Sequence, residues 1–95
     1  MTPEGKVKAA VKKILTEAGA WYCTPLGAGY GRAGVPDFIV CHRGKFVAIE
    51  CKAGKGKTTA PQDRELAAIA GAGGHTFVIR EDGLGYLKTM LKDCV

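Results

Sequence analysis

The chain has 95 residues, of which 46% are hydrophobic and 24% charged, and its formal net charge is +5. This length allows a single modest core, so we expect residues 1–95 to form one domain with one function. No apolar run approaches the roughly 18 residues of a membrane span, and the first residues lack the continuous apolar region of a signal peptide. We therefore expect an intracellular protein, whose basic surface favours a polyanionic partner over a solvated surface without one.

The N-terminal half begins with a helix signal. Thr2 and Pro3 suit the N-cap and first helical position, and apolar residues then recur at helical spacing until Gly19. The aromatic run at residues 20–24 predicts a short strand that ends before Pro25. A glycine-rich loop follows it.

Two strand-like runs come next, at residues 37–41 and 45–52, separated by a turn signal at residues 42–44. Thr59 and Gln62 have the spacing of a capping box, and they predict a helix over residues 60–71. We expect this helix to bury three apolar side chains, namely Leu66, Ile69 and Ala70.

The last segments are a strand at residues 75–80 and a helix that Asp82 can cap. Leu84, Leu87 and Leu91 share one face of that helix. The predicted order is α-β-β-β-α-β-α, which indicates a small α/β domain with a central mixed sheet flanked by helices. The four cysteines lack paired C-x-x-C spacing, so we expect free thiols.

The loop at residues 29–34 spells G-x-G-x-x-G, the spacing of a dinucleotide-binding turn. That motif needs a helix directly after it, whereas Pro36 disfavours helical geometry at Val35 and a β-branched strand follows. We therefore expect no nucleotide cofactor. The glycines are better explained as a loop that lets backbone approach a bulky ligand, or as a long turn.

The hairpin places two acids together. If Arg43 and Gly44 form a two-residue turn, Asp37 falls opposite Glu50, whereas a three-residue loop would make the two acids diagonal neighbours. Lys52 lies on the same strand face as Glu50. Opposed carboxylates repel unless a cation compensates, but a purely structural cluster of the two acids with Lys52 also fits this spacing.

G34-V35-P36-D37, twelve intervening residues and E50-C51-K52 resemble the core of the PD-(D/E)XK nucleases. The GVPD form, with Gln62 after it, is similar to the VRR-NUC (virus-type replication-repair nuclease) branch. The resemblance runs from about Glu4 to Arg80, and the predicted element order agrees with that family's core.

The resemblance implies a metal site and its chemistry. Asp37, Glu50 and the backbone carbonyl of Cys51 would bind Mg²⁺ or Mn²⁺, and the Cys51 side chain would point away. Oxygen ligands suit these ions. Glu4 matches an acidic residue of the family's first helix that reaches the site, although the helix dipole alone favours an acid there.

The remaining catalytic residues follow from the same resemblance. Lys52 would orient or deprotonate the attacking water, or stabilise charge on the phosphate. Gln62 matches a glutamine that hydrogen-bonds near that water, with helix capping as its alternative role. Asp63 and Glu65 are expected on a solvated face.

Basic residues flank this predicted site. Arg32, Lys55 and Lys57 are placed to hold phosphates, and Tyr30 to stack on a base or sugar. The four lysines of the first helix lie largely on its exposed side, where solvation is as good an explanation as DNA contact: Lys6, Lys8, Lys12 and Lys13. No element is built to read base edges.

The resemblance thus implies a magnesium- or manganese-dependent, structure-selective DNA endonuclease of the stand-alone viral or phage type, similar to Holliday-junction resolvases. The family resemblance implies a homodimer, with Tyr86, Leu87, Met90 and Leu91 as candidate interface residues and core packing as their alternative. The competing hypothesis is a non-catalytic nucleic-acid-binding module in which Asp37, Glu50 and Lys52 only stabilise the fold.

Overall fold

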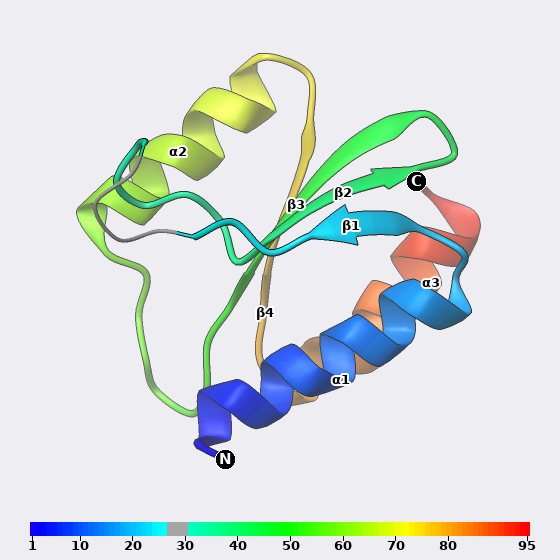
Figure 1. Cartoon of the computed structure of the whole chain (residues 1–95), viewed down its shortest axis with the longest axis horizontal. Coiled ribbons are helices and arrows are strands. Elements are labelled where there is room, and N and C mark those ends of the chain that lie inside the picture. The colour runs from blue at the N-terminus through cyan, green and yellow to red at the C-terminus, as the bar shows by residue number, and fades with distance from the viewer. Residues whose placement is uncertain (27–30) are drawn as a thin grey trace.

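The computed structural model describes residues 1–26 and 31–95, which contain three α-helices, four strands and one short 3₁₀ turn (Figure 1). The elements are α1 (Pro3–Glu17), β1 (Trp21–Cys23), β2 (Phe38–His42), β3 (Lys45–Cys51), α2 (Ala60–Gly71), β4 (His75–Ile79), the 3₁₀ turn Glu81–Gly83 and α3 (Leu84–Asp93). This is the predicted α-β-β-β-α-β-α order. None of the helices in these two ranges is long and apolar enough to cross a membrane.

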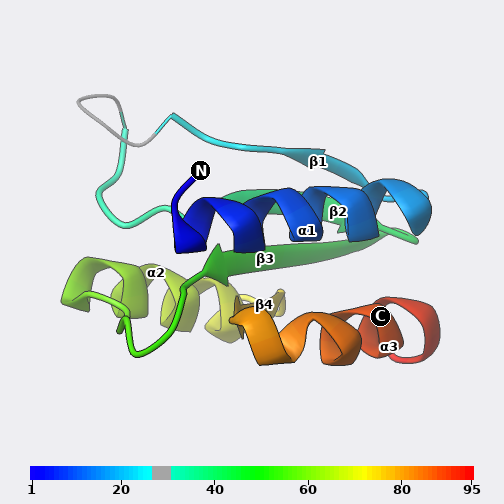
Figure 2. The ribbon, with the colours of Figure 1, turned by 90° about the horizontal axis from the view of Figure 1, so that it is seen from below.

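The four strands form one mixed sheet in the order β1-β2-β3-β4. The first two pairs are antiparallel and β3 pairs with β4 in parallel. Helices α1 and α3 contact one another, whereas α2 lies apart from them in both views (Figures 1 and 2). The predicted fold class is confirmed.

The main core lies between α1, α3 and one face of the sheet. Helix α1 begins where predicted, because the Thr2 side chain accepts a hydrogen bond from the Gly5 amide and Pro3 occupies the first turn. The buried side chains come from α1, the three longer strands and α3, and include Val7, Val11, Leu15, Phe38, Val40, Val47, Ile49, Cys51, Phe77, Ile79, Leu87 and Leu91.

The β2–β3 hairpin has the predicted register. Arg43 and Gly44 form a two-residue turn in which both residues have positive φ, 52° and 78°, as the hairpin turns that match strand twist require. His42 pairs with Lys45, and the pairing continues to Phe38 and Ile49. One further step along this register brings Asp37 beside Glu50.

Helix α2 has the predicted bounds and capping box, but its burial was predicted wrongly. It contains no fully buried residue: Leu66 and Ile69 are half-buried and Ala70 is exposed. The reason is that α2 packs mainly against β4 and leaves much of its surface in solvent.

The start of α3 also differs from the prediction. Asp82 lies inside the 3₁₀ turn, and the N-cap position of α3 belongs to Gly83, which has no side-chain cap. The prediction that Asp82 caps this helix was wrong, because the extra turn shifts the helix start. Leu87 and Leu91 are core residues and cannot serve as interface residues, whereas Tyr86 is 56% exposed.

Candidate active site

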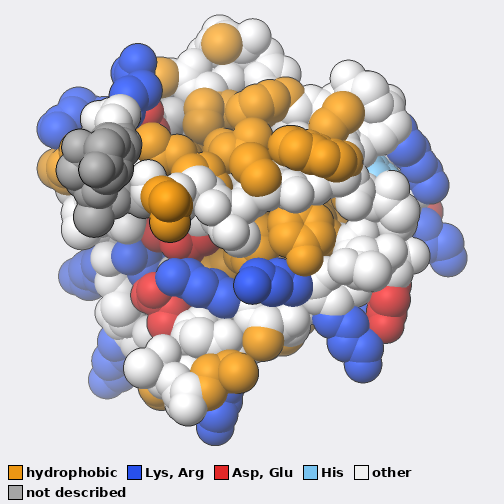
Figure 3. All heavy atoms as spheres, in the orientation of Figure 1, with side chains coloured by type: hydrophobic (Ala, Val, Ile, Leu, Met, Phe, Trp, Pro, Cys, Tyr) orange, Lys and Arg blue, Asp and Glu red, His pale blue; other side chains and the backbone are white. Residues whose placement is uncertain are grey.

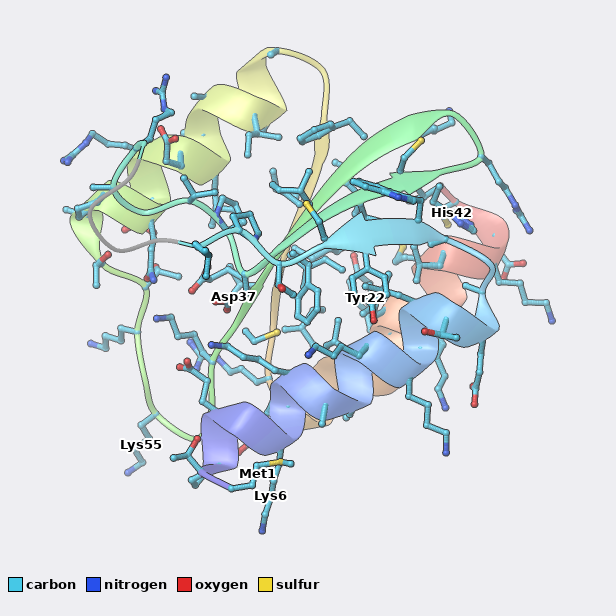
Figure 4. The ribbon with its side chains drawn as sticks, in the orientation of Figure 1. Met1, Lys6, Tyr22, Asp37, His42 and Lys55 are labelled. Carbon is cyan, nitrogen blue, oxygen red and sulfur yellow. The ribbon has the colours of Figure 1, made fainter. Side chains whose placement is uncertain are left out.

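The predicted site lies where β2 begins and β3 ends, between α1 and the first turn of α2. Figure 4 shows Asp37 in this region, far from His42 at the other end of β2. Strand β3 ends in Glu50 and Cys51, and Lys52 follows. Four segments distant in the sequence therefore meet at one end of the sheet.

Two reciprocal hydrogen bonds hold Asp37 and Glu50 together. The Cys51 amide donates to Asp37 Oδ2 at 2.8 Å, and the Asp37 amide donates to Glu50 Oε1 at 3.3 Å. Each carboxylate is thus fixed by the backbone of the neighbouring strand. The Glu50 side chain is only 3% exposed, while that of Asp37 is 20% exposed.

Lys52 and Gln62 converge on the other oxygen of Glu50. Lys52 Nζ lies 3.6 Å from Glu50 Oε2, and Gln62 Nε2 donates to the same oxygen at 2.9 Å. Gln62 also completes the capping box, since its Oε1 accepts from the Thr59 amide at 2.9 Å. Its two proposed roles are therefore compatible, because one amide group serves both.

The buried position of Glu50 changes its acidity. Burial first, and the nearby charge of Asp37 second, raise the pKa of Glu50 to about 7, although Lys52 partly offsets them. Burial also raises the pKa of the Cys51 thiol to about 12. The Cys51 side chain packs in the core, pointing away from the carboxylates as predicted.

The fold of the chain has a counterpart among solved structures. Neither the protein-family models nor the curated proteins give a match to the sequence. A solved structure described as a "VRR_NUC domain" matches the whole chain, with a TM-score of 0.80, 25% sequence identity and coverage of 100% of each chain. The chain has the VRR-NUC fold.

Within this VRR-NUC fold, Lys8 is a neighbour of the carboxylates that sequence reasoning missed. Its Nζ lies 3.4 Å from Asp37 Oδ1 and 3.5 Å from Glu4 Oε2. Partial burial lowers the pKa of Lys8, but the charges and hydrogen bonds of Asp37 and then Glu4 outweigh it and raise the pKa above its usual value. The i,i+4 spacing of Glu4 and Lys8 was the available signal.

Glu4 is connected to the site only through Lys8. Its own side chain is 41% exposed and makes no hydrogen bond or ion pair with Asp37 or Glu50. Within residues 1–26 and 31–95, no group of three His, Cys, Asp or Glu side chains is arranged to hold a metal ion. The geometry therefore brings Asp37, Glu50, Lys52 and Gln62 together and leaves Glu4 outside that set.

The predicted phosphate-binding residues lie on separate loops and do not converge as the carboxylates do. Arg32 is 75% exposed but makes a bidentate pair with Glu65, Nε to Oε1 at 2.6 Å and Nη2 to Oε2 at 3.1 Å. The expectation that Glu65 is simply solvated was wrong. Lys55 and Lys57 are exposed on the loop between β3 and α2, and Tyr30 lies outside the described residues.

Gly34 approaches protein backbone rather than open space. Its φ is +79°, and a Cβ placed on it would lie 2.4 Å from the Pro61 carbonyl carbon and 2.6 Å from the Gln62 nitrogen. The interpretation that this glycine admits a ligand was wrong, because the first turn of α2 fills that position. Gly34 thereby lets the segment that leads to Asp37 and β2 approach Gln62 closely. Gly29 lies outside the described residues.

The donor set suits a hard divalent cation. Asp37 and Glu50 supply carboxylate oxygens, and Cys51, whose backbone carbonyl is the third candidate ligand, directly follows Glu50 at the end of β3. Mg²⁺ commonly uses one or two carboxylates and keeps several waters, so a third acidic side chain is not required. The residues present therefore fit Mg²⁺ or Mn²⁺.

A separate pocket of about 330 Å³ lies at the opposite end of β2. His42 lines it, and its Nε2 is 2.8 Å from the Leu91 carbonyl oxygen. Arg43 donates to the Lys92 carbonyl oxygen at 3.0 Å. These contacts satisfy carbonyl groups at the end of α3, so they explain the two side chains as helix-capping groups.

Proposed function

We propose that this chain is a magnesium- or manganese-dependent DNA endonuclease that hydrolyses phosphodiester bonds. The single observation that carries the proposal is the convergence of Asp37, Glu50, Lys52 and Gln62 at one sheet end of a VRR-NUC fold. The fold match supports a nuclease of the PD-(D/E)XK type. The competing hypothesis, a binding module with a structural charge cluster, does not account for burying Glu50 beside another carboxylate.

The residues of the site have separate roles in this proposal. Asp37, Glu50 and the Cys51 carbonyl would hold the cation, which when bound supplies charge neutralisation at the phosphate and lowers the pKa of a coordinated water. Lys52 is held close to Glu50, with its Nζ 3.6 Å from Glu50 Oε2. It can orient or deprotonate the attacking water, or stabilise charge on the phosphate.

Gln62 positions the site in this proposal. Its amide is fixed at both ends, by the Thr59 backbone and by Glu50 Oε2. Because the helix cap and the site share one side chain, the first turn of α2 helps to hold Glu50 in place.

DNA is the substrate class that the basic chain favours, and we propose a branched DNA such as a four-way junction. The cations available for phosphates are exposed on the loops that flank the carboxylates, namely Arg32, Lys55 and Lys57. Figure 4 shows Lys55 at the outer bend of its loop, pointing away from Asp37. Recognition would be by backbone and shape, since these loops offer no helix for a major groove. We further propose that the enzyme works inside cells and is of the viral or phage type.

The decisive test is a cleavage assay on a four-way junction, a flap and a linear duplex, with Mn²⁺, Mg²⁺ or EDTA. Asp37→Asn and Lys52→Met should fold, as circular dichroism would show, but lose cleavage by about 10²-fold or more. Asp82→Asn and Lys12→Met remove the same charges from exposed positions and should leave turnover unchanged. Binding without any metal-dependent cutting would favour the binding module.

A homodimer is part of this proposal, because two sites related by a two-fold axis suit paired cuts in a branched substrate. Trp21, Cys41 and Phe46 are direct partners across β1, β2 and β3 and form an exposed apolar row on the sheet face opposite the core. Figure 3 shows hydrophobic side chains grouped on the face seen in Figure 1, above a group of acidic and basic side chains. A standard interface buries about 800 Å² per partner, and a molecule of 33 × 32 × 20 Å is large enough to provide that area.

The dimer is tested by light scattering coupled to size-exclusion chromatography. Trp21→Ser should shift the protein toward a monomer. Leu26→Ser is the control, since Leu26 is an exposed apolar residue that lies outside this row. A wild-type protein that is monomeric at tens of micromolar, or two variants that behave alike, would contradict this surface.

A further inference from the structure

The free oxygen of Asp37 already has a cationic partner from the protein. Oδ2 accepts the Cys51 amide hydrogen at 2.8 Å, which leaves Oδ1 as the oxygen that this amide does not hold. Lys8 Nζ lies 3.4 Å from that Oδ1. The side chain of Lys8 is 40% exposed, so it reaches the site from solvent rather than from the core.

We propose that Lys8 is the counter-ion of the metal-free site, and that a divalent cation must displace its ammonium from Asp37 Oδ1. The inference rests on the proposed function in one respect, namely that the cation binds at Asp37 and Glu50. It adds a residue that competes for the same oxygen. Lys8 is a positioning residue in this account, because it neutralises Asp37 before the metal arrives.

The exchange follows from charge and geometry. An ammonium and a divalent cation cannot both contact one carboxylate oxygen without strong repulsion at such short separation. Lysine has a flexible four-carbon stem, so its ammonium can move while α1 stays in place. Displacement therefore requires no change of the backbone.

Glu4 supplies the second position for the ammonium. It lies one helical turn before Lys8, and its Oε2 is 3.5 Å from Lys8 Nζ. When the metal occupies Asp37, Lys8 can remain paired with Glu4 instead of becoming fully solvated. Glu4 then assists metal binding through Lys8, without being a ligand, which agrees with its absence from the set that converges on Glu50.

The competition predicts the direction in which each substitution changes the affinity for the metal. Half-exposed ion pairs contribute modestly, so removing Lys8 should tighten metal binding by roughly two- to fivefold. Glu4→Gln should weaken metal binding, because Lys8 then stays on Asp37. In a Lys8→Met background, Glu4→Gln should have no further effect, whereas loss of a true ligand would still weaken binding.

The experiment is a Mn²⁺ titration of the full chain without DNA, read by the electron paramagnetic resonance signal of free Mn²⁺. Lys8→Met is compared with Lys12→Met, which removes one charge from an exposed position of the same helix. Tighter binding by Lys8→Met alone supports the proposal. Equal affinities for the two variants, or weaker binding by Lys8→Met, would overturn it.

The same titration separates this inference from the proposed function. Equal affinities, together with metal-dependent cleavage by the wild type, would remove the role of Lys8 and keep the nuclease. No site-specific Mn²⁺ binding by the wild type or by Lys8→Met, with Asp37→Asn as the reference, would remove both.

Discussion

Glu50→Gln should stabilise the metal-free protein at alkaline pH. The side chain of Glu50 is 3% exposed and lies beside Asp37, so its ionised form is unfavourable in the folded state. The pKa of Glu50 rises from the ordinary 4.5 to about 7, which at about 1.4 kcal/mol per pH unit is on the order of 3 kcal/mol. Glutamine has the same shape without the charge.

The sign of the pH dependence follows from the raised pKa. The folded state holds the Glu50 proton more tightly than the unfolded state. The stability that this proton contributes is therefore fully present below pH 4.5 and is lost as the pH rises through about 7. The substitution should therefore gain between about 1 and 3 kcal/mol at pH 8 and about a quarter as much at pH 5. The lower value allows for the new amide donor, which faces Gln62 and Lys52.

The measurement is urea unfolding in EDTA at pH 5, 6, 7 and 8. Glu17→Gln is the control, because Glu17 is an exposed acid and its removal tests the general effect of charge. A gain from Glu50→Gln that is the same at pH 5 and pH 8 would refute the reasoning, since it would show that ionisation of Glu50 is not what destabilises the protein.

Two further substitutions test how the site is positioned. Gly34→Ala should destabilise the protein by about 1–3 kcal/mol more than Gly19→Ala. Both glycines have positive φ, but of the two only Gly34 would place a Cβ against backbone of the described residues. Thermal unfolding measures the difference, and equal losses of stability would contradict the packing argument. Glu65→Gln should raise the affinity for DNA by releasing the Arg32 guanidinium, and Arg32→Ala should lower it, as fluorescence anisotropy at fixed salt would show. If both variants bind like the wild type, Arg32 takes no part in DNA binding.

Local sequence rules predicted the hairpin and the helix starts well. The Arg43-Gly44 turn fixes the register by its length alone, and Thr59 with Gln62 forms the expected capping box. These features depend on residues close in sequence, whose geometry is set by φ preferences and short hydrogen bonds. The adjacency of Asp37 and Glu50 followed directly from the register.

Features that depend on how separate elements pack were not predictable in this way. The rotation of α1 about its axis decides whether Lys8 meets solvent or Asp37, and periodicity fixes that rotation only to within a broad face. The Arg32–Glu65 pair and the Gly34 contact join the loop to α2 across about thirty residues. The open packing of α2 likewise depends on what covers it, which apolar spacing does not reveal.

The reciprocal hydrogen bonds make the hairpin register part of the candidate site. Asp37 is fixed by the Cys51 amide of β3, and Glu50 by the amide of Asp37 itself, so neither carboxylate is held by side chains alone. A slip of one residue would turn Asp37 to the opposite face of the sheet and break both bonds together. The two-residue turn at Arg43-Gly44, although it lies at the far end of β2, therefore determines whether the two acids meet at all.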